Sequence, residues 1–271
     1  MRLAVLALSA LALTGCSNGA AADDRNTVVA SFYPLAWAAG HVSRGARVVD
    51  LTPPGVEPHD VELTPSDTKT IDDARLVIYL SGGFQPAVED AVAARTGPSL
   101  DVRGTSKDPH VWLDPVRFVR IVQRVGRALG PSSSTAPVVR ELRAVDAAYR
   151  RGLRDCDRRT IVTTHTAFGL LARRYGLRQL SLAGLAPEAE PGPRDLERLI
   201  DDVRASGATT VFAEPLVSRR IIRTVAREAH VDVAVLDPIE GLGSDRLEAG
   251  EDYLSVMRDN LVVLRKALGC R

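Results

Sequence analysis

Three histidines and one aspartate stand where an α/β protein usually places its binding residues. Each one follows a predicted strand or precedes a predicted helix, and together they are His59, His110, His165 and Asp237. Residues just past the carboxyl ends of parallel strands line the binding crevice of such a protein. If the two halves of the chain face each other, two histidines from the first half can meet a histidine and an aspartate from the second.

The chemistry of these four groups is that of a divalent-metal site. Neutral imidazoles donate nitrogen lone pairs, and one carboxylate offsets half the charge of the ion. The nitrogens favour zinc, whereas manganese prefers more oxygen ligands. Spacing alone does not decide the matter, because no two ligands form a compact motif and a histidine after a strand can equally be structural. The remaining histidines, His41 and His230, lie on predicted helices and are interpreted as surface or structural residues.

Two sets of alternating strands and helices must position these residues. In the first half, strands are predicted at residues 27–31, 46–51, 75–80 and 99–102, with Thr64 as a helix N-cap and Asp114-Pro115 opening a helix. In the second half, strands are predicted at residues 160–164, 179–182, 209–213 and 232–236. This alternation predicts two α/β lobes with largely parallel sheets.

A long helix is predicted between the two halves. The apolar residues of 136–156 recur with a period of 3.6 residues. The predicted organisation is a leader at 1–15, a tether at 16–26, an N-terminal lobe at 27–133, a linking helix at 134–156 and a C-terminal lobe at 157–271.

Composition excludes one class of partner. The chain has 271 residues, 45% of them hydrophobic and 25% charged, with 35 basic against 34 acidic side chains. This balance is typical of globular proteins and gives no excess of positive charge for binding nucleic acid.

The N-terminus has the pattern of an export signal. Arg2 precedes a short apolar run, which ends in Leu13-Thr14-Gly15-Cys16. The run is too short to span a bilayer, which takes roughly 20 residues. The last four residues resemble a bacterial lipobox, so we expect Cys16 to carry lipid and to anchor the protein outside the cytoplasm without a membrane span. The alternative is a plain secretory signal with an incidental cysteine.

Export changes how the other cysteines are interpreted. With Cys16 lipidated, Cys156 and Cys270 remain, and two cysteines outside the cytosol most often pair. We therefore predict a Cys156–Cys270 disulfide, with two free thiols as the alternative.

Four local strings resemble one family. In order along the chain, they resemble the ligand motifs of the zinc and manganese receptors of bacterial ABC importers. The strings are Glu57-Pro58-His59-Asp60-Val61-Glu62-Leu63, Asp108-Pro109-His110-Val111-Trp112-Leu113-Asp114-Pro115, Thr164-His165-Thr166-Ala167-Phe168-Gly169 and Leu236-Asp237-Pro238-Ile239. The resemblance to this ZnuA/TroA-like family covers essentially the whole mature chain. It is closest to the zinc branch, since manganese members tend to have Glu in place of His165.

The resemblance implies a fold, a site and partners. Two lobes would be joined by one rigid helix, with Zn²⁺ between them on His59, His110, His165 and Asp237, and with no catalytic residue. A separate permease and ATPase would be the partners, since the chain has no Walker-type loop, and a metallochaperone could deliver the metal. We expect a monomer. Glu57, Asp60 and Glu214 could orient the imidazoles or be ordinary surface charges.

Three alternatives stay open at this point. A zinc hydrolase would need an open coordination position and a general base, for which Glu57 could serve. A metal-containing adhesin lipoprotein would need no importer. A manganese or iron receptor of the same family would differ only in the metal.

Overall fold

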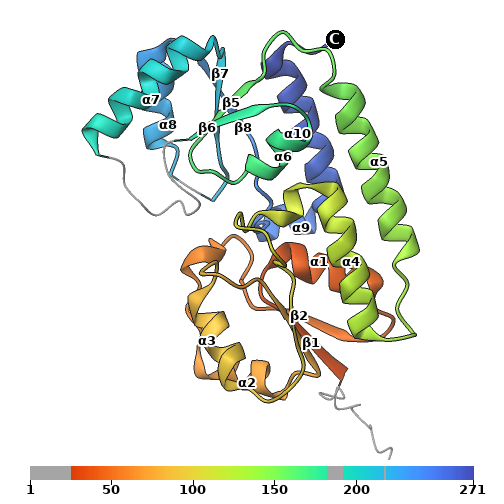
Figure 1. Ribbon diagram of the computed structural model, residues 1–271. Coiled ribbons are helices and arrows are strands. Elements are labelled where there is room, and N and C mark those ends of the chain that lie inside the picture. Colours follow the sequence, from red (N-terminus) through yellow and green to blue (C-terminus); the bar gives the residue numbers. More distant parts are fainter. Residues whose placement is uncertain (1–25, 182–191, 217) are drawn as a thin grey trace, which may run out of the picture.

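The computed structural model describes residues 26–181, 192–216 and 218–271, which form two α/β lobes (Figure 1). Cys16 and the predicted leader lie outside this part, so the lipidation of Cys16 stays a prediction. Within the described residues, none of the helices is both long and apolar enough to cross a membrane.

The N-terminal sheet has the order β2-β1-β3-β4, and every pair of neighbours is parallel. Its strands are β1 (Thr27–Ala30), β2 (Arg47–Asp50), β3 (Leu76–Tyr79) and β4 (Ser99–Asp101). Alternate side chains point to opposite faces of a strand. On β1, Val28 packs toward the large core that contains α1 (Tyr33–Val42) and α4 (Pro115–Leu129), and Val29 packs toward α2 (Pro65–Asp73) and α3 (Pro86–Ala94).

Two local features of this lobe match the sequence prediction. Thr64 caps α2, because its hydroxyl accepts a hydrogen bond from the Asp67 N–H and the Asp67 carboxylate accepts one from the Thr64 N–H. Asp114 caps α4 by accepting from the N–H groups of Val116 and Arg117.

The C-terminal sheet repeats this design with the order β6-β5-β7-β8 and parallel pairs throughout. Its strands are β5 (Thr160–Thr163), β6 (Arg178–Ser181), β7 (Thr210–Ala213) and β8 (Asp232–Val235). One face packs against α7 (Pro193–Ser206) and α8 (Arg220–Ala229). The other faces the shared core with α6 (Gly169–Arg174) and α10 (Tyr253–Leu268). The predicted two-lobe fold is confirmed.

A helix at one side of the molecule spans both lobes (Figure 1). This helix, α5 (Ala136–Gly152), packs on α1 and α4 of the first lobe and on α10 of the second. It ends four residues before the predicted boundary at residue 156. The predicted domain boundaries otherwise remain predictions.

The predicted disulfide between Cys156 and Cys270 is present. It lies just past the end of α5, where the two cysteines form an isolated antiparallel bridge.

A buried carboxyl group at the end of β2 predicts a pH dependence of stability. Burial raises the pKa of the Asp50 carboxyl to about 7, although a hydrogen bond from the Thr52 N–H favours its charged form. A carboxyl group whose pKa is raised by folding makes the folded state bind the proton more tightly. Stability is therefore lost as pH rises from about 4 through 7.

We expect Asp50→Asn to remove this loss. The variant should match the wild type in urea unfolding at pH 4 and exceed it by about 1–3 kcal/mol at pH 8, after allowance for the partial exposure of Asp50. The exposed Asp90→Asn is the matched control and should show no such pH-dependent gain. An equal gain at both pH values for Asp50→Asn would contradict this account.

Candidate metal site

Two of the clustered histidines come from the N-terminal lobe. His59 lies on a 3₁₀ turn (Pro58–Asp60) in the connection after β2, where its ring packs edge-on against Phe84 with centroids 4.4 Å apart. His110 lies between β4 and a second 3₁₀ turn (Val111–Leu113) and is fully buried. Asp108 holds His110 from behind, with Oδ1 3.1 Å from both its Nδ1 and its backbone nitrogen.

His165 comes from the C-terminal lobe, directly past the carboxyl end of β5. Its backbone carbonyl accepts hydrogen bonds from the Thr163 hydroxyl at 2.6 Å and from Gln179 Nε2 at 2.8 Å. Its Nδ1 lies 2.6 Å from Oε2 of Glu214, which follows β7 and is also fully buried. The ring is thereby fixed with Nε2 facing the other lobe.

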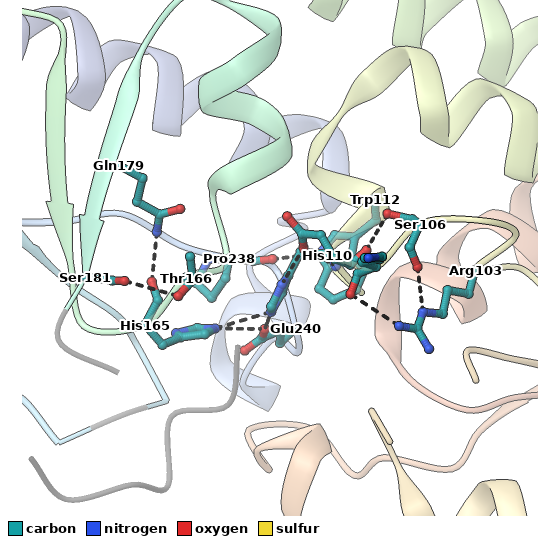
Figure 2. A network of polar contacts seen from close by, with 12 residues as sticks. Arg103, Ser106, His110, Trp112, His165, Thr166, Gln179, Ser181, Pro238 and Glu240 are labelled. Carbon is teal, nitrogen blue, oxygen red and sulfur yellow. Dashed lines mark hydrogen bonds and ion pairs between the residues drawn. The ribbon is translucent and has the colours of Figure 1, made fainter. Parts of the chain in front are cut away.

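A carboxylate on the C-terminal lobe completes the cluster, and it belongs to Glu240. Its Oε1 lies 3.1 Å from His110 Nε2, 3.4 Å from His165 Nε2 and 3.7 Å from His59 Nε2. Figure 2 shows His110, His165 and Glu240 converging from their separate segments. One ligand atom from each of the four residues lies within 4.8 Å of all the others.

Asp237, predicted as the fourth ligand, is not in this cluster. Its Oδ2 lies 2.6 Å from Arg246 and its Oδ1 accepts a hydrogen bond from the Ile239 N–H at 2.7 Å. Both oxygens are therefore engaged by neighbouring groups, and the carboxylate that lies in the cluster in place of Asp237 is that of Glu240, three residues further along the chain. The predicted meeting of His59, His110 and His165 is present in the structure.

The spacing fits a small tetrahedral ion. Zn–N bonds of about 2.0–2.1 Å place the ligand atoms of a tetrahedron about 3.3 Å apart. The distance between the Nε2 atoms of His110 and His165 is 3.4 Å, and those to Glu240 bracket the same value. Within the described chain, Glu240 Oε2 and His59 Nε2 are buried without a hydrogen-bond partner. Unpartnered buried polar atoms are costly, so this donor set fits a cation.

The charges around the cluster are arranged for positive charge at its centre. Burial opposes ionisation of Glu240, but its contacts with His110, His165 and His59 hold its pKa well below the usual range. Burial lowers the pKa of His165, yet Glu214 and Glu240 outweigh this and raise it to about 10. In both cases neighbouring opposite charge outweighs burial.

The other carboxylates singled out in the sequence differ in their surroundings. Glu214 contacts His165, as described. Burial and the charge of Glu240 raise the pKa of Glu57 to about 9. Asp60 is exposed on the surface. The signal that could have identified Glu240 is its place in the loop Asp237-Pro238-Ile239-Glu240, which follows a predicted strand.

Comparison with known proteins decides the family. The family model for the zinc-uptake complex component A, periplasmic (ZnuA), matches residues 28–267. The chain belongs to the ZnuA family. The cluster of His59, His110, His165 and Glu240 lies within the matched region.

Individual ZnuA relatives agree with this assignment. The zinc-binding lipoprotein AdcA of Streptococcus pneumoniae serotype 4 is 31% identical over 97% of this chain and 60% of AdcA. The high-affinity zinc uptake system protein ZnuA of Bacillus subtilis is 29% identical over 98% of this chain and 97% of that protein.

A solved structure shows the same fold. The crystal structure of the Zn(II)-bound ZnuA-like domain of S. pneumoniae AdcA superposes with a TM-score of 0.75 at 30% identity, covering 89% of this chain and 98% of that domain. The chain spans only 56–60% of the length of the streptococcal AdcA proteins that it matches.

Proposed function

We propose that this protein is an extracytoplasmic receptor that captures Zn²⁺ between its lobes and delivers it to an ABC-type permease. The observation that carries the proposal is the buried cluster of three imidazoles and one carboxylate, whose ligand atoms lie within 4.8 Å of one another. The names of the relatives, which are zinc-binding and zinc-uptake proteins, support it.

Zinc is the metal that this ligand set favours. Three imidazole nitrogens and one carboxylate oxygen suit Zn²⁺, whereas an oxygen-rich set would suit manganese. The ion would be cargo, held by His59, His110, His165 and Glu240. Four protein ligands complete a tetrahedral site and leave no position for the water that a zinc hydrolase activates.

The geometry also supports capture from both sides of the site. His59 and His110 come from the first lobe, and His165 and Glu240 come from the second. The Asp108 and Glu214 carboxylates fix the two buried imidazoles with Nε2 toward the site. Such outer partners set the ring orientation and raise the basicity of the ligand.

Attachment and partners follow from the same proposal. A lipid on Cys16 would hold the receptor at the outer face of the cell membrane. AdcA of S. pneumoniae is itself named a lipoprotein. A membrane permease with a separate ATPase would accept the metal, a metallochaperone could supply it, and the receptor would act as a monomer.

Competitive metal binding tests the proposal. The chain from residue 17 onward, produced by export so that the disulfide forms, is stripped of metal and offered equimolar Zn²⁺, Mn²⁺ and Fe²⁺. Native mass spectrometry should show one zinc ion per chain as the dominant species. A dominant manganese or iron complex would overturn the choice of metal, and the absence of any complex would overturn the receptor function.

Delivery to a permease is tested in cells. Deletion of the gene should slow growth in zinc-depleted medium, and added zinc should restore it. Unchanged growth of the deletion strain would favour the adhesin alternative, provided that no second zinc importer is active in that strain.

A further inference from the structure

The loop that carries Glu240 contains a strained residue. Ile239 immediately precedes Glu240, is fully buried and has a φ of 55°. A β-branched side chain rarely adopts this left-handed conformation, so the backbone is strained there. Such a conformation persists only where its surroundings hold it in place.

Asp237 is the main clamp on this residue. Its Oδ1 accepts a hydrogen bond from the Ile239 N–H at 2.7 Å, which closes a tight turn around Pro238. Its Oδ2 lies 2.6 Å from Arg246, and Arg246 also contacts Glu251 at 2.6 Å. The carboxylate thus bonds the strained peptide with one oxygen and a guanidinium with the other.

Two further side chains hold the backbone of the same turn. Asn260 on α10 accepts a hydrogen bond from the Asp237 N–H at 2.9 Å and donates one to the Asp237 carbonyl at 2.7 Å. Trp112, from the opposite lobe, donates its indole N–H to the Pro238 carbonyl at 2.7 Å (Figure 2). All three hydrogen bonds are buried, so each is difficult to replace with water.

We infer that Asp237 is a positioning residue that keeps Ile239 left-handed and thereby aims Glu240 at the three imidazoles. The inference rests on the proposed zinc-receptor function. Relaxation of Ile239 to negative φ would rotate the following peptide and turn the Glu240 side chain away from His59, His110 and His165. Asp237 acts on the metal only through this turn, since both of its oxygens are already engaged.

Zinc affinity and cobalt spectra of matched variants test the inference. Asp237→Ala removes the acceptor for the Ile239 N–H and should weaken Zn²⁺ binding by about 10–100-fold, as loss of an outer partner typically does. Asp237→Asn keeps an acceptor oxygen, and Arg246 keeps Glu251, so its affinity should stay within about threefold of the wild type. The Co²⁺ absorption spectrum of Asp237→Ala should move toward that of Glu240→Ala, and the spectrum of Asp237→Asn should match the wild type.

A second substitution tests the role of the turn directly. Glycine adopts positive φ readily, so the double variant Asp237→Ala/Ile239→Gly should regain most of the zinc affinity lost in Asp237→Ala. Circular dichroism shows whether each variant is folded. If the double variant does not fold, the comparison of the Co²⁺ spectra of Asp237→Ala and Asp237→Asn tests the inference instead.

The outcomes separate this inference from the proposed function. Wild-type protein that binds no zinc would overturn both. Wild-type binding with an unchanged Asp237→Ala variant would overturn the inference alone. Equal losses in Asp237→Asn and Asp237→Ala, or a folded double variant without recovery, would also overturn it.

Discussion

Replacement of His165 by alanine is expected to weaken zinc binding by more than about 100-fold. Loss of an outer partner alone typically costs about 10–100-fold in metal affinity, and this change removes one of the four proposed direct ligands. It also leaves the buried Glu214 facing a cavity without its imidazole partner. The measurement is a competition titration against a chromogenic chelator on the folded, metal-free protein.

The same experiment on the other proposed ligands should give losses of similar size. His110→Ala removes a fully buried imidazole, and His59→Ala removes one whose side chain is 6% exposed. Glu240→Ala removes the carboxylate that offsets half of the charge of the ion. Water can occupy the vacated position more easily at His59, so we expect its loss to be the smallest of the three histidine variants.

Two exposed histidines provide matched controls. His41 lies at the end of α1 with its Nδ1 2.8 Å from the Trp37 carbonyl, and His230 follows α8 with a φ of 57°. His41→Ala should keep wild-type affinity. His230→Asn should do so as well, because asparagine tolerates this conformation. Wild-type affinity in all three variants of the clustered histidines would show that zinc binds elsewhere.

The sequence predicted the fold because its local signals agree with one another. The short apolar strings around Val28, Val77 and Ile161 became buried parallel strands, and Thr64 and Asp114 became helix caps. In a protein with parallel strands, residues just past the carboxyl ends of strands line the binding edge. His165 follows this rule, and together with the local motif around it the rule predicted its place in the cluster.

The fourth position could not be predicted in the same way. Asp237 stands directly after a strand, as His165 does, and carries an equally suitable carboxylate. Which of the two carboxylates enters the site depends on the φ of Ile239, and the Asp237 turn that holds it is itself fixed by side chains distant in sequence, Asn260 and Trp112. A left-handed isoleucine contradicts local preference, so local patterns point away from the turn that brings Glu240 into the site. The short helix α9 (Ser244–Glu248), which supplies Arg246, was likewise absent from the predicted elements.

Replacement of both bridged cysteines by serine should lower the free energy of unfolding of the metal-free protein by about 2–5 kcal/mol. The Cys156–Cys270 bridge joins residues 114 positions apart and so restricts a long loop of the unfolded chain. It also ties the C-terminal end of the chain, just past α10, to the segment that follows α5. Urea unfolding of the double variant and of the oxidised wild type gives the comparison.

The disulfide and the neighbouring contacts can be separated by reduction. The Arg158 N–H bonds the Leu268 carbonyl at 3.0 Å, and the Tyr149 hydroxyl bonds the Met257 carbonyl at 2.7 Å, so α5 and α10 stay in contact without the bridge. We therefore expect the double variant to fold and to bind zinc with wild-type affinity. A reducing agent should destabilise the wild type to the level of the variant and leave the variant unchanged. Equal stability of oxidised wild type and variant would mean that these contacts already restrict the end of the chain as much as the bridge does.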